Sequence, residues 1–240
     1  MPSTLRRLLP RGPAPWPAEA RPGLYRRPSR PEEADLFALC LPDHPGPWIE
    51  ALTPDATGER RARAARFRAP MDALRCLAAE ALLWCAMEER HGLEPSALAT
   101  VRDAQGKPRF LHQAHLHFSL SHSGPWVLCA LDHRPVGVDV ELESPLRPGL
   151  IEAALGAEEL RELQAAPEPA RAGAFFRTWT LKESLLKAAG TGLGLDPRSI
   201  ELGPDRQPLR GAPPAPEGCA WTLQPLVLVP GAWAALCCAR

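Results

Sequence analysis

The stretch Pro135-Val-Gly-Val-Asp-Val-Glu-Leu-Glu-Ser-Pro145 predicts the strand around which the rest of the chain is arranged. Its apolar residues recur at every second position, which is the period of a β-strand. Asp139 and Glu141 therefore share one face with Gly137, and the two acidic Cα atoms are roughly 6.6 Å apart. The opposite face carries only apolar side chains, those of Val136, Val138, Val140 and Leu142.

Two carboxylates on one strand face admit two interpretations. If the face is half-buried, the like charges repel, so that one carboxylate takes up a proton or a cation lies between them. A hard divalent cation with oxygen ligands fits such a pair, and Gly137 would leave the face open to a ligand. The alternative is a solvated edge strand with two ordinary surface acids. The stretch alone favours neither interpretation.

The composition limits the classes of function. A chain of 240 residues can form one large domain or two small ones. Its 28 basic and 28 acidic residues balance, which predicts no nucleic-acid or membrane partner. The seven cysteines form no Cys-x-x-Cys pair and mostly lie in apolar runs, so we expect reduced core thiols and a cytoplasmic protein. The sequence shows neither a signal peptide nor an apolar run of transmembrane length.

The order of motifs predicts a duplicated chain. Residues 1–34 are rich in Pro and Arg and lack periodicity, so we expect a poorly ordered lead-in. After it, two long helices are predicted, Met71–Glu89 and Arg171–Ala189, each ended by glycine. A shorter helix is expected over Leu150–Leu163. The first strand is expected at Asp35–Leu41.

Three matches follow the two long helices in the same order. The helices are followed by Gly92-Leu-Glu-Pro and Gly194-Leu-Asp-Pro, and then by a strand and a polar turn. Further on, Ser123-Gly-Pro-Trp corresponds to Pro230-Gly-Ala-Trp. The predicted fold class is therefore α+β, with two similar halves at 35–134 and 135–240. The acidic strand then lies at the seam between the halves, where ligand sites concentrate.

Cationic and histidine side chains offer further candidate sites. Arg60 and Arg63 would share a helix face, which is either a solvated surface or an anion site, because guanidinium groups bind phosphate with two parallel hydrogen bonds. Arg75 lies beside the apolar stripe of the first long helix. Four histidines could indicate zinc, but they lack the spacing of a zinc site, so exposed histidines are the better interpretation. They are His112, His115, His117 and His122.

The second long helix places charged and aromatic residues on one face. Glu183 and Lys187 lie on the stripe of Phe176, Trp179 and Thr180. Charges beside aromatic side chains are costly to bury without a partner. The alternative is an ordinary ion pair one helical turn apart, which stabilises a helix by about 0.3 kcal/mol. That pair would not explain why the charges lie on the aromatic face.

These segments resemble the two signatures of the 4′-phosphopantetheinyl transferases, at the spacing of that family. They are Gly137-Val-Asp-Val-Glu141, and Phe176-Arg-Thr-Trp-Thr-Leu-Lys-Glu-Ser-Leu-Leu-Lys187 with Gly190-Thr-Gly-Leu193 after it. Gly106-Lys-Pro108 and Ser119-Leu-Ser-His-Ser-Gly124 resemble two further elements, upstream and in the expected order. The resemblance extends from about Asp35 to the C-terminus. It favours the monomeric, surfactin-synthetase-priming type, whose pseudo-twofold fold agrees with the duplication.

The resemblance implies a reaction and a set of roles. The phosphopantetheine arm of coenzyme A would pass to a serine of an apo acyl or peptidyl carrier protein, releasing adenosine 3′,5′-bisphosphate. Asp139, Glu141 and Glu183 would hold magnesium, or manganese, against the pyrophosphate. The implied catalytic residues are Glu183, Lys187 and His122. The implied contacts to the phosphates of coenzyme A are Arg60, Arg63, Arg75, Lys107, Ser121, His122 and Lys187.

The chemistry accounts for these residue types. Attack on the β-phosphorus adds charge to an already anionic substrate, which a metal ion and positioned cations would offset. Glu183, directly or through water, is the candidate base for the serine. Two other functions are considered: a carrier-binding relative without catalysis, which the three intact acids disfavour, and a magnesium phosphohydrolase, which leaves the arginines unexplained.

Overall fold

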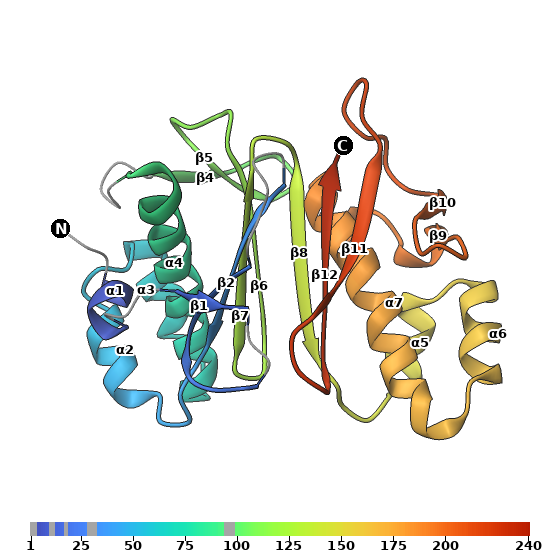
Figure 1. Ribbon diagram of the computed structural model, residues 1–240, viewed down its shortest axis with the longest axis horizontal. Coiled ribbons are helices and arrows are strands. Elements are labelled where there is room, and N and C mark those ends of the chain that lie inside the picture. The colour runs from blue at the N-terminus through green and yellow to red at the C-terminus, as the bar shows by residue number, and fades with distance from the viewer. Residues whose placement is uncertain (1–3, 10–12, 17–18, 28–32, 94–98) are drawn as a thin grey trace.

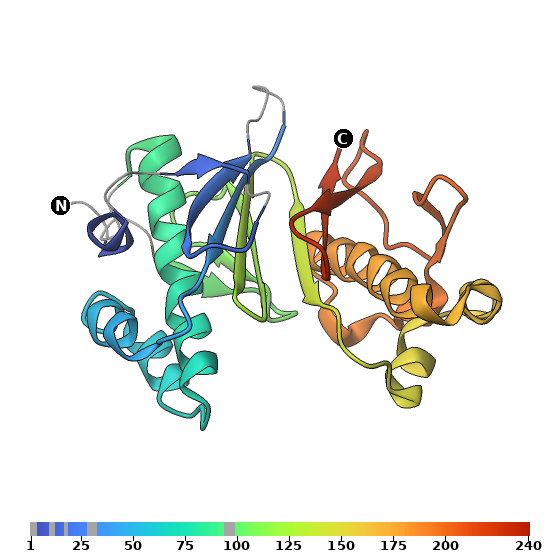
Figure 2. The same ribbon diagram turned by 60° about the horizontal axis from the view of Figure 1, so that its bottom comes forward.

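The computed structural model describes residues 4–9, 13–16, 19–27, 33–93 and 99–240. Helices, a sheet, a second sheet and further helices follow one another across the molecule (Figures 1 and 2). No helix among the described residues is long and apolar enough to cross a membrane. The elements are α1 (Thr4–Leu8), β1 (Ala14–Pro15), β2 (Gly23–Arg27), β3 (Asp35–Cys40), α2 (Gly46–Leu52), α3 (Gly58–Ala64), α4 (Pro70–His91), β4 (Thr100–Arg102), β5 (Pro108–Phe110), β6 (His117–Ser123), β7 (Trp126–Asp132), β8 (Val136–Leu142), α5 (Pro148–Ala154), α6 (Ala157–Ala165), α7 (Glu168–Ala189), β9 (Glu201–Leu202), β10 (Pro208–Arg210), β11 (Trp221–Val227) and β12 (Ala232–Ala239).

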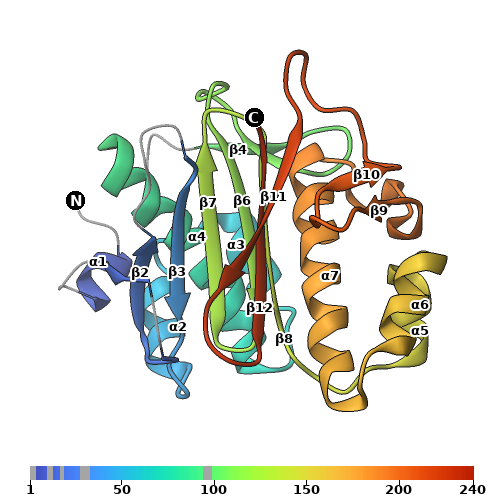
Figure 3. The ribbon, with the colours of Figure 1, turned by 45° about the vertical axis from the view of Figure 1, so that its right-hand side comes forward.

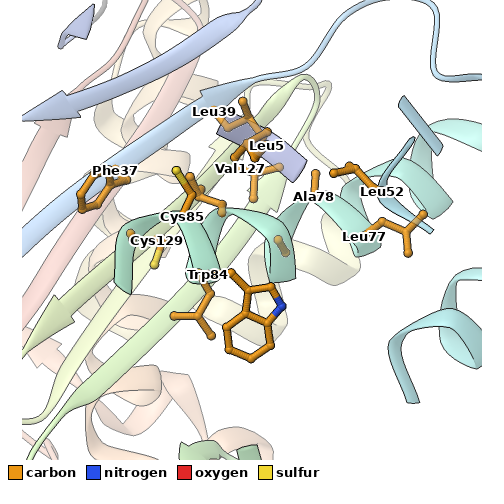
Figure 4. Close-up of a cluster of buried hydrophobic side chains, with 14 of the residues drawn as sticks. Leu5, Phe37, Leu39, Leu52, Leu77, Ala78, Trp84, Cys85, Val127 and Cys129 are labelled. Atoms are coloured by element: carbon orange, nitrogen blue, oxygen red, sulfur yellow. The ribbon is translucent and has the colours of Figure 1, made fainter. Parts of the chain in front are cut away.

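The N-terminal half is a five-stranded sheet, in the order β1-β2-β3-β7-β6, with α4 packed on one face. The apolar stripe of α4 forms this core, and Figure 4 shows Cys85 of α4 beside Cys129 of β7. Both thiols are buried, and burial raises the pKa of Cys129. All seven cysteines are free, and six of them are buried, which agrees with the prediction of reduced core thiols.

The described part of residues 1–34 differs from the expected disordered lead-in. It forms α1, β1 and β2, and β2 pairs antiparallel with β3 at one side of the sheet. Leu5 and Leu24 are 0% and 3% exposed. These two apolar side chains fall between the prolines and arginines that dominated the composition, and burying them anchors the segment.

The C-terminal half is a three-stranded sheet, in the order β11-β12-β8, with α7 on its outer face (Figure 3). The face of Gly137 is not open to a ligand, so that expectation was wrong. A Cβ atom on Gly137 would lie 1.9 Å from the Ser184 carbonyl oxygen and 2.4 Å from the Ala188 nitrogen. The missing side chain lets the backbone of α7 approach the backbone of β8, and helix packing fills the space assigned to the ligand.

The helix expected over Leu150–Leu163 is two helices, α5 and α6, separated at Leu155 and Gly156. The single-helix prediction followed the spacing of the leucines and overlooked the glycine. Leu155 is extended, and the backbone of Gly156 donates a 3.0 Å hydrogen bond to the Glu159 carboxylate in the first turn of α6. Glycine at this position begins a new helix.

The two halves share one order of elements. Each has a first strand, a 22-residue helix that ends at a left-handed glycine, a small two-stranded hairpin and a final pair of strands. The strand orders β3-β7-β6 and β8-β12-β11 correspond, and all four pairings are antiparallel. Glu94 and Pro95 of the Gly92-Leu-Glu-Pro motif lie outside the described residues, which omit 94–98. A pseudo-twofold rotation stays a prediction, because equal connectivity does not fix the rotation between the halves.

Strands β6 and β8 form the seam between the halves. They belong to different sheets, and serine hydroxyls on β6 link them. The backbone N–H groups of β8 donate to these hydroxyls at 3.0, 3.3 and 3.0 Å. The pairs are Val138 with Ser119, Val140 with Ser121, and Leu142 with Ser123. We call this set the serine ladder. Buried N–H groups require such partners, so the ladder replaces the missing backbone pairing.

Replacement of Gly137 tests the contact between α7 and β8. Gly137→Ala should lower the free energy of unfolding by about 3 kcal/mol, because helix backbone has to move to admit the methyl group. Gly149→Ala, in α5 with no atom within 4 Å of the new methyl, should change it by less than about 1 kcal/mol. Urea unfolding of both variants measures the difference. Equal effects would contradict this packing.

Candidate active site

The centre of the candidate site is Asp139 on β8. Its side chain is buried, and Oδ1 accepts hydrogen bonds from Ser121 Oγ at 2.8 Å and Lys187 Nζ at 2.6 Å. Lys187 Nζ also donates to Ser121 Oγ at 2.9 Å. The second oxygen, Oδ2, is buried and has no hydrogen-bond partner among the described residues. Asp139 is therefore held on one side and retains an unused acceptor on the other.

Glu141 and Glu183 are close enough to Asp139 to share its electrostatic environment. The pKa of both carboxyl groups is raised, first because burial removes hydration and then because Asp139 repels their charge. Lys187 opposes the shift in both. Ser123 Oγ donates to Glu141 at 3.0 Å, and Trp179 also donates to this carboxylate. The three predicted carboxylates thus gather around one lysine.

This arrangement decides between the alternatives left open above. β8 is not a solvated edge with surface acids, because Asp139 is 3% exposed and α7 packs on its face. Lys187 forms its ion pair with Asp139 on another element, so Glu183 and Lys187 are more than an ion pair one turn apart on a helix surface. The aromatic face of α7 carries charges because it faces the acids of β8.

The donor set suits a hard divalent cation. Three carboxylates offer only oxygen ligands, and Asp139 Oδ2 is a buried acceptor with no partner in the described chain. As the side chains stand, however, no three His, Cys, Asp or Glu residues of the described ranges are arranged to hold a metal ion. Side-chain rotation would have to bring the three carboxylates onto one ion.

Cations of the N-terminal half approach the same seam from α3 and α4. The pKa of His122 on β6 is lowered, first by partial loss of hydration and then by the charges of Lys187, Arg75 and Arg63. Arg75 Nε donates to the Gly124 carbonyl oxygen at 2.6 Å, which directs the guanidinium toward the end of β6. Arg63 is exposed on α3. The predicted anion-binding residues thus include a group of three near Lys187.

Two predicted contacts lie apart from this group. Arg60 Nε is 3.8 Å from the buried carboxylate of Glu80, which also accepts two hydrogen bonds from Thr57 at the start of α3. Lys107 Nζ donates to the Ala188 carbonyl oxygen at 2.8 Å, at the end of α7. The motif spacing carried no signal for either contact, because Glu80 and Ala188 are remote in sequence.

Sequence reasoning did not single out Ser123 or Ser119. Serine recurs at every second position in the segment Ser119–Gly124, at 119, 121 and 123. The period-two signal could have predicted three hydroxyls on one edge of β6. It could not show that β8 lies beside that edge.

Comparisons with known proteins identify one family. The model of the 4′-phosphopantetheinyl transferase superfamily matches residues 135–238, which include all three carboxylates and Lys187. The chain is 35% identical over 161 residues to the 4′-phosphopantetheinyl transferase psf-1 of Bacillus pumilus, covering 66% of this chain and 69% of the relative. The chain belongs to the 4′-phosphopantetheinyl transferase superfamily.

Two further members of this family are similar to the chain over most of its length. The transferase Sfp of Bacillus subtilis is 32% identical over 151 residues, 62% of this chain and 67% of that protein. The transferase HetI of Nostoc sp. is 32% identical over 205 residues, 82% and 83% of the two chains. The holo-[acyl-carrier-protein] synthase of Thermotoga maritima aligns with 44% of this chain and 62% of its own at TM-score 0.34 and 22% identity, too weak a likeness to argue from.

Because the three carboxylates repel one another, we expect this site to lower the free energy of unfolding of the metal-free chain. Removing one charge with Glu183→Gln should raise the free energy of unfolding at pH 7, without added metal, by about 0.5–2 kcal/mol. Since the folded-state pKa of Glu183 is raised, the wild-type chain gains stability as this group protonates on lowering the pH. The advantage of the variant should therefore shrink at pH 5.

Thermal and urea unfolding at the two pH values measure the effect. Glu152→Gln, an exposed site on α5, is the matched control and should change stability by less than about 0.5 kcal/mol. A destabilised Glu183→Gln protein at pH 7 would contradict the repulsive cluster.

Proposed function

We propose that this chain transfers the 4′-phosphopantetheine arm of coenzyme A to a serine of an apo acyl or peptidyl carrier protein. The serine oxygen attacks the β-phosphorus, the bond from that phosphorus to the bridging oxygen breaks, and adenosine 3′,5′-bisphosphate leaves. The observation that carries the proposal is the meeting of Asp139, Glu141 and Glu183 with Lys187 at the seam, in a chain of this family.

The distribution of charge supports a bound nucleotide across the seam. Arg63, Arg75 and His122 approach from the N-terminal half, and Lys187 approaches from α7. Guanidinium groups bind phosphate oxygens with paired hydrogen bonds. We assign Arg63, Arg75, Ser121 and His122 to the phosphates remote from the reacting centre, and Lys187 to the pyrophosphate. Arg60 is an indirect contributor in this proposal, because its guanidinium lies apart from this group, beside the Glu80 carboxylate.

Asp139, Glu141 and Glu183 are the residues that would hold magnesium, or manganese. Bound there, the ion would neutralise and orient the pyrophosphate. The unpartnered Asp139 Oδ2 supports this assignment, since an uncompensated buried acceptor is costly without a cation or donor. Lys187 remains on Oδ1 and stabilises the charge that develops on the leaving phosphate.

Glu183 is the proposed base for the carrier serine. In the metal-free chain, burial and then the charge of Asp139 raise the pKa of its carboxyl group; a carboxylate held at the reacting centre can accept the serine proton. Its place on α7, one turn before Lys187, puts the base and the phosphate contact on one rigid element. The serine proton would pass to Glu183 directly or through one water molecule.

The decisive experiment incubates the chain with an apo carrier, coenzyme A and magnesium. Mass spectrometry of a panel of fatty-acid, polyketide and peptide-synthase carriers detects the added arm. An unmodified panel with carrier binding would favour a non-catalytic relative. An unmodified panel with hydrolysed coenzyme A would favour a phosphohydrolase.

Loss of the central carboxylate should remove transfer without unfolding the chain. Asp139→Asn preserves size and the hydrogen bond to Ser121 but removes charge, so transfer should fall at least about 100-fold. Magnesium should raise the melting temperature of the wild-type chain and not of the variant. Glu152→Gln serves again as the surface control. Near wild-type transfer by Asp139→Asn at limiting magnesium would refute the assignment.

Arg75 should act on binding more than on the chemical step. Arg75→Met should raise the KM for coenzyme A about tenfold and lower kcat less, because the arginine meets a remote phosphate. The effect should be smaller with 3′-dephospho-coenzyme A. Steady-state kinetics with both substrates provide the measurement. Equal losses with the two substrates would place Arg75 away from the 3′-phosphate.

The division into halves at residues 134 and 135, the monomeric state and the cytoplasmic location are parts of the same proposal. Light scattering of the purified chain at micromolar concentration measures its molar mass in solution and so tests the monomeric state. A dimer would contradict the monomeric type.

A further inference from the structure

Lys107 occupies an unusual position for a lysine. It follows the hairpin turn between β4 and β5, where the Asp103 carboxylate accepts hydrogen bonds from the backbone nitrogens of Gln105 and Lys107. The turn is therefore rigid, and the side chain leaves it toward the C-terminal half. Burial lowers the pKa of Lys107 to about 8, so its ammonium loses hydration on the way.

The Lys107 ammonium ends between two elements of the other half. Nζ donates to the Ala188 carbonyl oxygen at 2.8 Å, in the last turn of α7. It also lies 3.5 Å from the Val136 carbonyl oxygen, at the start of β8. The last carbonyl groups of a helix carry partial negative charge and have no partner within the helix, so a cation there is stabilising.

We propose that Lys107 is a positioning residue, which fastens the end of α7 to the start of β8 and thereby holds Lys187 against Asp139. These two elements carry the three carboxylates and Lys187, and Ala188 directly follows Lys187 in the chain. The inference rests on the proposed function for its kinetic consequences, and on geometry alone for its structural ones.

The last turn of α7 is held from two sides. Its inner side touches β8 at Gly137, where the Ala188 nitrogen leaves no room for a Cβ atom. Its end is covered by Lys107, whose Cδ would lie 3.2 Å from a Cβ atom on Gly190. Gly190 also has a φ of 75°, which favours glycine. A small shift of this turn would change the 2.6 Å contact between Lys187 and Asp139.

This role differs from the phosphate contact expected for Lys107. A phosphate ligand should present its ammonium to the solvent or to other anion-binding groups. The Lys107 ammonium instead donates hydrogen bonds to backbone carbonyl oxygens. Arg63, Arg75 and His122 lie near Lys187. Removal of Lys107 should therefore change kcat through Lys187 and leave the affinity for coenzyme A nearly unchanged.

The test compares Lys107→Met with Arg109→Met, which removes an exposed cation of the same hairpin that makes no hydrogen bond or ion pair to α7 among the described residues. In Lys107→Met, kcat should fall about 10- to 100-fold, because misplacing a reacting group by an ångström has effects of this size. The KM for coenzyme A should change less than about threefold, equally for 3′-dephospho-coenzyme A. Lys107→Arg should recover part of kcat. In a Lys187→Met background, Lys107→Met should have less than about a twofold further effect.

Amide hydrogen exchange provides a second measurement that does not depend on activity. Amides in the last turn of α7 should exchange at least about tenfold faster in Lys107→Met than in the wild-type chain or in Arg109→Met, with α4 unchanged. If Lys107→Met does not fold, Lys107→Gln, which keeps an N–H donor, is measured by the same criteria and should show a smaller change of the same kind.

Two results would overturn the inference. One is a KM for coenzyme A raised about tenfold at unchanged kcat, with no effect on the dephosphorylated substrate, which would make Lys107 a phosphate contact. The other is unchanged exchange at the end of α7. Failure of the wild-type chain to modify any carrier would refute the proposed function instead, and the exchange result would still decide the role of Lys107.

Discussion

Three serine hydroxyls join the neighbouring edge strands of the two halves, beside an apolar core that both sheets share. Strands β6 and β8 lie side by side, but each is the last strand of its own sheet. Direct backbone pairing would fuse the sheets at the usual spacing of about 4.8 Å. The serine ladder satisfies N–H groups of β8 through side chains instead, and it places polar groups along this edge of the seam. An anionic substrate needs such a seam.

The ladder also connects the structural role of Ser121 with its place in the site. Its oxygen accepts a hydrogen bond from the Val140 nitrogen and contacts Asp139 and Lys187. One hydroxyl thus joins the two sheets and orients the central carboxylate. Burial, and then repulsion by Asp139, raises the pKa of the Glu141 and Glu183 carboxyl groups. The packing of α7 on β8 opposes that repulsion and holds the acids together for binding charged groups.

Several features could be predicted because they depend on short-range periodicity. Alternating residues identified β8, and helical spacing placed Glu183 and Lys187 on the face of α7 that meets it. The errors arose partly from contacts between distant segments and partly from a local glycine signal that the leucine spacing concealed. The expected open face at Gly137 is filled by α7, and the single helix over Leu150–Leu163 is broken at Gly156. The N-terminal segment is anchored by two leucines that composition averages hide.

The sequence by itself determined the types of side chain and the faces on which they lie. It determined that Asp139 and Glu141 share a strand face, since alternation is a property of the strand backbone. Only the tertiary structure decided which distant groups meet: Lys187 with Asp139, Glu80 with Arg60 and, across the seam, Lys107 with the end of α7. Such pairs are separated by 20 or more residues, and their contact follows from packing and burial, which no local pattern encodes.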